Sequence, residues 1–275
     1  MTFSPIIPTG GLAGWSYLSR TLEQQETLYA ASPQNARETS AFRERIATIT
    51  TAEELVADRD LLKVALGAYG LGDDLNNRAF IEKVLAEGTQ DPASFANRLA
   101  DKRYTAFSEA FGFGDLGGPW TGLSGFADRV IESYQERDFE IAVGQVNETM
   151  RLALNMQREL PEIVNESSNP TTQWLLVLGN PPLRQAIETA FGLPSSFSGL
   201  DLDRQVEDLQ DIAQQRFGVD TVSGLIETET FESLTRLYVT RAELAAPTIT
   251  SSPQLSLFAT GASAQSILLT LYQGA

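Results

Sequence analysis

The residues most suggestive of chemistry are glycines, because residues 112–120 read GFGDLGGPW and the first six fit G-x-G-x-x-G. That pattern holds a dinucleotide when a β-strand enters the glycines and a helix begins on them, since free amides then face the pyrophosphate. Here the glycines follow an expected helix whose face carries Tyr104, Phe107 and Phe111. Exposed carbonyls at the C-terminus of a helix repel phosphate. We therefore interpret the stretch as a connector anchored by Trp120, and we expect no cofactor.

Paired acids are the second candidate, because carboxylates that face a cleft can perform acid–base work or hold Mg²⁺ or Ca²⁺. The pairs are Asp58/Asp60, Asp73/Asp74, Asp201/Asp203 and Glu207/Asp208. Most of them lie at expected helix starts or turns, where Asp caps backbone amides. We expect caps here, and neither catalytic residues nor metal ligands. Two further combinations, Arg151 with Glu140 and Arg204 with Glu207, fit either buried or surface ion pairs.

Composition narrows the possible chemistry further. The 275 residues include no cysteine and no histidine. A thiolate nucleophile, a disulfide, a zinc–cysteine site and a Ser–His–Asp triad are therefore excluded. The 36 acidic residues outnumber 20 basic ones, and the net charge of -16 repels nucleic acids and anionic lipids. We expect a protein that is not an enzyme and that has a protein partner.

No segment reads as a membrane anchor or a secretory signal. The first residues, MTFSPIIPTGGLAGW, lack a basic region, and the runs Trp174–Leu178 and Ile267–Leu269 are too short to span a bilayer. The sequence predicts a soluble protein without membrane insertion. We expect it in the cytoplasm, or exported without a cleaved signal peptide.

Helical periodicity dominates the chain and predicts an all-α fold. No hairpin dipeptide separates alternating apolar runs, so we expect no significant sheet. A capping box is expected at Thr51 and Glu54. The longest pattern covers about residues 123–160, a central helix of roughly 57 Å if unbroken. Pro161 should kink or end that helix, because it lacks an amide donor.

One phrase recurs where helices should end: AYGL at 68–71, AFGF at 110–113, AFGL at 190–193 and RFGV at 216–219. Glycine in the left-handed conformation, followed by an apolar residue, stops a helix in this way. Either these are four ordinary helix ends, or residues 60–112 and 180–218 form two similar helical layers by internal duplication.

The sequence suggests three regions. Residues 1–31 form an N-terminal extended segment and an amphipathic helix, 32–245 a single helical domain, and 246–275 a Ser/Thr/Pro-rich connector with a short C-terminal helix. The apolar faces of the two terminal helices must either dock on the domain or meet a partner. The candidate partner-contacting residues are Trp15, Leu18, Leu22, Tyr29, Ile267, Leu268 and Leu271.

Taken together, several stretches resemble the bacterial family catalogued as domain of unknown function 1217. The resemblance covers about residues 12–240, and it rests on ITTAEELVADRDLLKVALGAYGL (49–71), DKRYTAFSEAFGF (101–113), ESYQERDFEIAVGQVNETMRLAL (132–154), TTQWLLVLGNPPLRQAIETAFGLP (171–194) and LDLDRQ (200–205). Members are often encoded among flagellar genes. The resemblance implies an α-helical protein connected with motility, and it implies no catalytic residue.

Our hypothesis is a non-enzymatic structural or assembly protein of the bacterial flagellum, acting through contacts with a flagellar component or with itself. One alternative is a cytoplasmic binding module or export chaperone for a helical partner. A more remote alternative is a carboxylate-based enzyme, which would need a pocket where acids and arginines converge.

Overall fold

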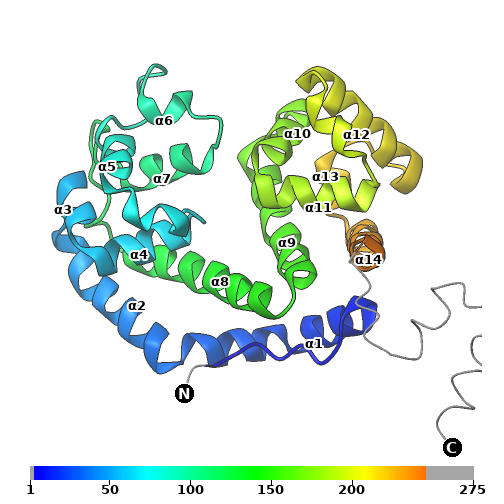
Figure 1. The fold of residues 1–275 in the computed structure, drawn as a ribbon. Helices are drawn as coiled ribbons and strands as arrows, with labels where there is room; N and C mark the ends of the chain where they lie inside the picture. Colours follow the sequence, from blue (N-terminus) through cyan, green and yellow to red (C-terminus); the bar gives the residue numbers. More distant parts are fainter. Residues whose placement is uncertain (1–2, 246–275) are drawn as a thin grey trace, which may run out of the picture. The chain divides into compact units, whose positions relative to one another are not determined.

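The computed structural model describes residues 3–245, and every regular element in that range is a helix (Figure 1). This confirms the prediction of an all-α fold. Residues up to Glu243 form one compact unit. The α-helices are α1 Gly11–Ala30, α2 Pro33–Arg45, α3 Ala52–Ala57, α4 Arg59–Ala68, α5 Arg78–Ala86, α6 Phe95–Arg98, α7 Arg103–Phe111, α8 Phe126–Val146, α9 Glu148–Glu166, α10 Pro170–Gly179, α11 Pro181–Phe191, α12 Leu202–Phe217, α13 Val222–Leu225 and α14 Thr228–Ala245. Short 3-10 helices cover Ile46–Thr48, Gly72–Asn76 and Ser195–Gly199.

Local sequence signals set the ends of many helices. The capping box at the start of α3 is confirmed: the Glu54 amide donates to Thr51 Oγ1 at 3.2 Å, and Glu54 Oε2 accepts from the Thr51 amide at 3.2 Å. The four recurring glycines are Gly70, Gly112, Gly192 and Gly218, and all have positive φ. They therefore stop their helices as the recurring phrase predicts. The idea of two duplicated layers stays a prediction.

The expected central helix is two helices, because the chain turns at Asn147. Asn147 has φ -155° and ψ 107°, which ends α8, and its Oδ1 accepts from the Met150 amide at 3.2 Å, which caps α9. Pro161 lies inside α9, so the expected helix end at this proline is wrong. A kink at Pro161 stays a prediction. An Asn side chain that satisfies a free amide stabilises a new helix start, and that start replaces one long rod by two packed helices.

Two hydrophobic cores form within the unit, and α8 contributes to both. The first core gathers side chains of α2 to α5 and α7, and α8 adds Val130 and Tyr134 to it. The second core gathers side chains of α9 to α14, and α8 adds Phe139 and Val143 to it. Residues 135–138 form the turn of α8 between Tyr134 and Phe139. All four are polar, and none of them belongs to either core.

Helix α1 is docked along α8, as Figure 1 shows. Its Leu18 is fully buried in the second core, and Trp15, Leu22 and Tyr29 pack against that core while remaining partly exposed. Within residues 3–245, no helix is both long enough and apolar enough to cross a bilayer.

Candidate functional site

The glycine stretch that fits a dinucleotide pattern is a loop whose two ends are joined by a backbone hydrogen bond. Gly112, with φ 65°, ends α7, and a helix precedes it where a nucleotide site needs a strand. The Trp120 amide donates to the Phe111 carbonyl at 3.0 Å. A Cβ on Gly112 would lie 2.2 Å from Trp120 Nε1, so the indole occupies the space beside the glycine. The interpretation as a connector anchored by Trp120 is confirmed.

In two of the acidic pairs the first residue caps a helix, as expected. Asp58 Oδ1 accepts from the amides of Asp60 and Leu61 at the start of α4. Asp201 Oδ1 accepts from the Asp203 amide at the start of α12. Each such bond satisfies an amide that the first helical turn leaves free.

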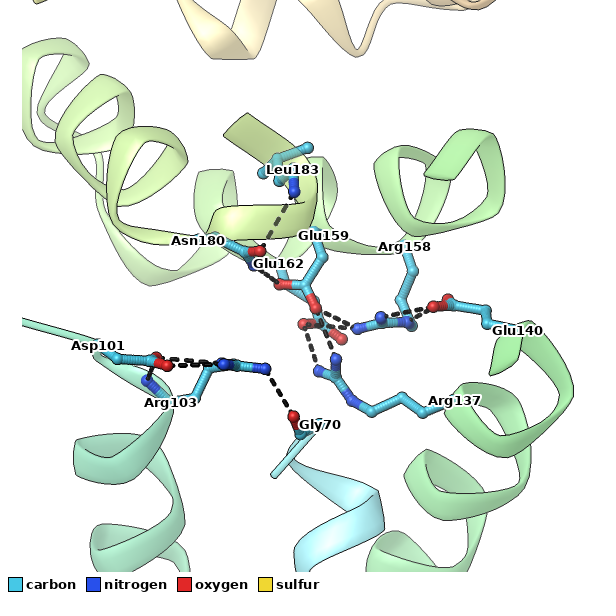
Figure 2. Close-up of polar contacts among 10 residues, drawn as sticks. All are labelled: Gly70, Asp101, Arg103, Arg137, Glu140, Arg158, Glu159, Glu162, Asn180 and Leu183. Carbon is cyan, nitrogen blue, oxygen red and sulfur yellow. Dashed lines mark hydrogen bonds and ion pairs between the residues drawn. The ribbon is translucent and has the colours of Figure 1, made fainter. Parts of the chain in front are cut away.

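The acids and arginines that do converge belong to a different cleft, which Figure 2 shows in part. It has a volume of about 560 Å³ and lies beside the polar turn of α8. Arg137 and Glu140 project from α8, and Arg158 and Glu159 project from α9. Four arginines line the cleft altogether: Arg103, Arg137, Arg151 and Arg158.

Most of these charges are paired within the chain. Arg158 Nε and Nη2 donate to the two oxygens of Glu140 at 2.6 and 3.0 Å, and Arg158 also pairs with Glu159. Arg137 Nη1 donates to Glu159 Oε1 at 2.7 Å. A third donor reaches Glu159 from the cap of α11, because Asn180 Nδ2 lies 2.9 Å from Glu159 Oε2. Glu159 is therefore the centre of the network.

Arg103 and Arg151 at the rim of the cleft are also engaged. Arg103 Nη2 donates to Asp101 Oδ2 at 2.7 Å, and its Nη1 donates to the Gly70 carbonyl at 2.6 Å. Arg151 Nε donates to Glu148 Oε2 at 2.8 Å. The Arg151–Glu140 pair considered above does not form, because Arg151 pairs with Glu148 and Glu140 pairs with Arg158. Arg204 does pair with Glu207, and this is a surface ion pair, one of the two alternatives given above.

The network favours the charged forms of Glu159 and Arg158. Burial works to raise the pKa of Glu159, but Arg137 and Arg158 outweigh it and hold that pKa below its ordinary value. Burial works to lower the pKa of Arg158, but its hydrogen bond to Glu140 and the nearby carboxylates raise it. A charged Glu159 and a charged Arg158 are poor proton donors and acceptors near neutral pH.

Two buried polar atoms beside this network have no hydrogen-bond partner: Arg137 Nε and Asn155 Oδ1. Asn155 lies one turn before Glu159 on α9 and lines the same cleft. One is a donor and the other an acceptor, and a water molecule can satisfy both kinds of group. The cleft thus contains the acids and arginines that a carboxylate-based enzyme would need, but these side chains form ion pairs with one another.

A second recessed surface lies between α1 and α14 and has a different character. This α1–α14 groove has a volume of about 630 Å³. Its apolar lining consists of Leu12, Trp15, Leu22, Ile226 and Phe231. Leu12 is 42% exposed. Large apolar side chains gathered on one exposed surface are typical of protein interaction sites.

Thr235 of α14 also lines the α1–α14 groove. The residue is 2% exposed, and its Oγ1 has no hydrogen-bond partner. A threonine within a helix commonly bonds to the carbonyl four residues earlier, as Thr240 does with Arg236 at 2.8 Å. The Thr235 hydroxyl makes no such bond.

The predicted partner-contacting residues separate into four groups. Trp15 and Leu22 line the α1–α14 groove. Leu18 is fully buried in the second core, so in this fold it supports α1 and offers no surface to a partner. Tyr29 donates its hydroxyl to Asp138 Oδ2 at 2.7 Å, outside the groove. Ile267, Leu268 and Leu271 lie outside the described residues.

The sequence analysis did not predict that α14 forms the side of the groove opposite α1. Phe231 and Thr235 are four residues apart on α14, so they share a helix face, and that spacing was visible in the sequence. Nothing in the sequence said that this face lies opposite Trp15. Glu140 and Arg158 were likewise not paired in advance, because they are 18 residues apart on two different helices.

Comparisons with known proteins place this chain in a family. A family model described as "Protein of unknown function (DUF1217)" matches residues 68–221, more than half of the chain. The X-ray crystal structure of a protein from Agrobacterium tumefaciens is similar, with 26% identity and a TM-score of 0.69. The match covers 89% of this chain and 100% of that one. No curated protein matches the sequence.

Proposed function

Because this chain belongs to the family of proteins of unknown function DUF1217, we propose that it is a non-enzymatic structural or assembly protein of the bacterial flagellum. It acts through protein–protein contacts. The flagellar setting comes from the resemblance of the sequence stretches quoted above, whose relatives are often encoded among flagellar genes. The mode of action comes from the geometry of the α1–α14 groove.

The single observation that carries the proposal is the apolar lining of that groove. Trp15 and Leu22 on α1 face the same space as Ile226 and Phe231. A groove between two helices accepts the apolar face of a third helix, whose anchors recur at three- and four-residue spacing. The occupant is therefore an amphipathic helix of a flagellar component.

The charged cleft beside Glu159 supports the same proposal. Arg137 and Arg158 are paired with carboxylates of this chain, so their charges stabilise the packing of α8 on α9. A network of this kind fixes the geometry of packed helices, and a stable α8 also supports α1, which packs against it. We assign the cleft a structural role.

The test is complementation of a deletion strain. Leu12→Arg places a charge on the apolar rim of the groove at an exposed position, so the variant should fold. Leu116→Arg is the matched control, because Leu116 is 87% exposed on the glycine loop away from the groove. We expect the deletion to impair swimming, and we expect wild type and Leu116→Arg, but not Leu12→Arg, to restore it.

Two outcomes would contradict the proposal. A deletion strain with normal flagella and normal swimming would remove the flagellar role. Restoration by Leu12→Arg at the level of Leu116→Arg would show that the groove is not the contact surface. Cell fractionation separates the proposal from the export chaperone, which would be found only in the cytosol together with its helical client.

A further inference from the structure

The α1–α14 groove carries positive charge on both of its helices. Arg20 on α1 and Arg236 on α14 line the groove, and both side chains are exposed. The Arg20 guanidinium donates through Nε to the Ser16 carbonyl at 3.0 Å. Neither arginine forms an ion pair with another residue in the part of the chain that the structure describes. Both charges are therefore available to an occupant.

Glu232 is the acid in the lining of this groove. It lies four residues before Arg236 on α14, but the two side chains do not form an ion pair. Two positive charges and one negative charge give the lining a formal charge of +1. The whole chain has a net charge of -16, so its apolar groove differs in sign from the rest of the molecule.

The chemistry of the lining specifies the occupant more closely than the apolar floor alone does. An apolar floor with a cationic border is complementary to an apolar helix with an anionic border. A helix bordered by lysines would meet Arg20 and Arg236 with like charge. Surface charges of this kind affect partner choice more than total affinity.

Resting on the proposed function, we infer that the partner segment is an amphipathic helix whose apolar face is bordered by Asp or Glu. The apolar side chains of that helix pack on Trp15 and Phe231. Its carboxylates lie within reach of the guanidinium groups of Arg20 and Arg236.

Synthetic peptides test this inference on the full-length protein. Three fluorescent 18-residue helical peptides share one leucine face and differ only in four flanking positions, which are Glu, Gln or Lys. Fluorescence anisotropy gives a dissociation constant for each. We expect the Glu peptide to bind about tenfold more tightly than the Lys peptide, since each exposed ion pair changes affinity by roughly 1.5- to 5-fold.

Charge reversal provides the decisive comparison. Arg20→Glu combined with Arg236→Glu should reverse the order, so that the Lys peptide binds more tightly than the Glu peptide. Arg204→Glu, an exposed arginine on α12 outside the groove, should leave the order unchanged. Raising the salt concentration from about 0.05 M to about 0.5 M should reduce the preference, because exposed charges are screened.

The outcomes separate this inference from the proposed function. Equal binding of the three peptides, abolished by Leu12→Arg, would overturn the charge inference and leave the groove as the contact surface. No binding by any peptide would overturn the inference, and the complementation experiment with Leu12→Arg would decide the proposed function separately. A homodimer in solution that Leu12→Arg dissociates would assign the groove to a second copy of this chain, and it would also overturn the inference.

Discussion

Arg158 and Glu140 form a bidentate ion pair that joins α9 to α8. Nε and Nη2 of Arg158 donate to the two carboxylate oxygens at 2.6 and 3.0 Å, and the side chains are only 6% and 7% exposed. Removing a buried charge from water costs several kcal/mol, so such a pair persists only with good geometry. Arg158 also pairs with Glu159, which accepts hydrogen bonds from Arg137 and Asn180.

Removing one partner of this pair should destabilise the protein strongly. Arg158→Ala leaves Glu140 buried without its cation, and we expect a loss of about 3–5 kcal/mol in the free energy of unfolding. Replacing both residues by apolar ones, Glu140→Leu with Arg158→Met, should cost clearly less. Urea unfolding measures both. A single variant within about 1 kcal/mol of wild type would contradict the structural role of the cleft.

The two turn glycines Gly112 and Gly218 should differ in their tolerance of alanine. Both have positive φ, which costs a non-glycine residue roughly 1–2 kcal/mol. A Cβ on Gly218 meets nothing within 4 Å, whereas a Cβ on Gly112 would overlap Trp120. We expect Gly112→Ala to cost more and to change the fluorescence of the protein. Equal unfolding free energies for the two variants would show that Trp120 does not anchor the loop.

The break between α8 and α9 should depend on Asn147. Its side chain caps α9, so Asn147→Ala should cost about 1 kcal/mol of unfolding free energy. Asn180→Ala is the informative comparison, because Asn180 caps α11 and also donates to Glu159. It should cost more than Asn147→Ala. If Asn147→Ala were neutral or stabilising, the helix start would not rest on this cap.

The stability of the protein should fall as pH rises towards 7 because of Glu136. Burial raises the pKa of this carboxyl to about 7, with Glu140 and Glu162 adding repulsion and Arg158 opposing the shift. The folded state therefore holds a proton between pH 4.5 and 7 that the unfolded chain has lost. Stability from this group is present below about pH 4.5 and is lost as pH rises through 7.

Glu136→Gln should remove that contribution. The variant should gain stability relative to wild type at pH 8 but not at pH 4.5, by about 1 kcal/mol or less, since the side chain keeps contact with solvent. Glu132→Gln, an exposed position on the same helix, is the control. Chemical denaturation at the two pH values measures the effect. An equal gain at both pH values would assign it to something other than titration.

The local part of the fold could be predicted because its causes are local. The capping box of Thr51 and Glu54 joins residues three apart, and a glycine such as Gly112 stops a helix through its own φ. The Asn147 break was missed because a continuous apolar pattern crosses it, and one polar side chain decided where the second helix begins. The expected helix end at Pro161 was also wrong, because α9 continues past this proline while it packs on neighbouring helices.

By itself the sequence determined the all-α class, many of the helix ends, and the chemistry that a chain without histidine or cysteine cannot perform. Tertiary structure decided that Glu140 meets Arg158, that Leu18 is buried, and that Trp15 faces Phe231 across an open groove. Helix formation depends on residues three and four apart, whereas these contacts join separate helices. Their partners are chosen by how whole helix faces pack, and no short stretch of sequence contains that information.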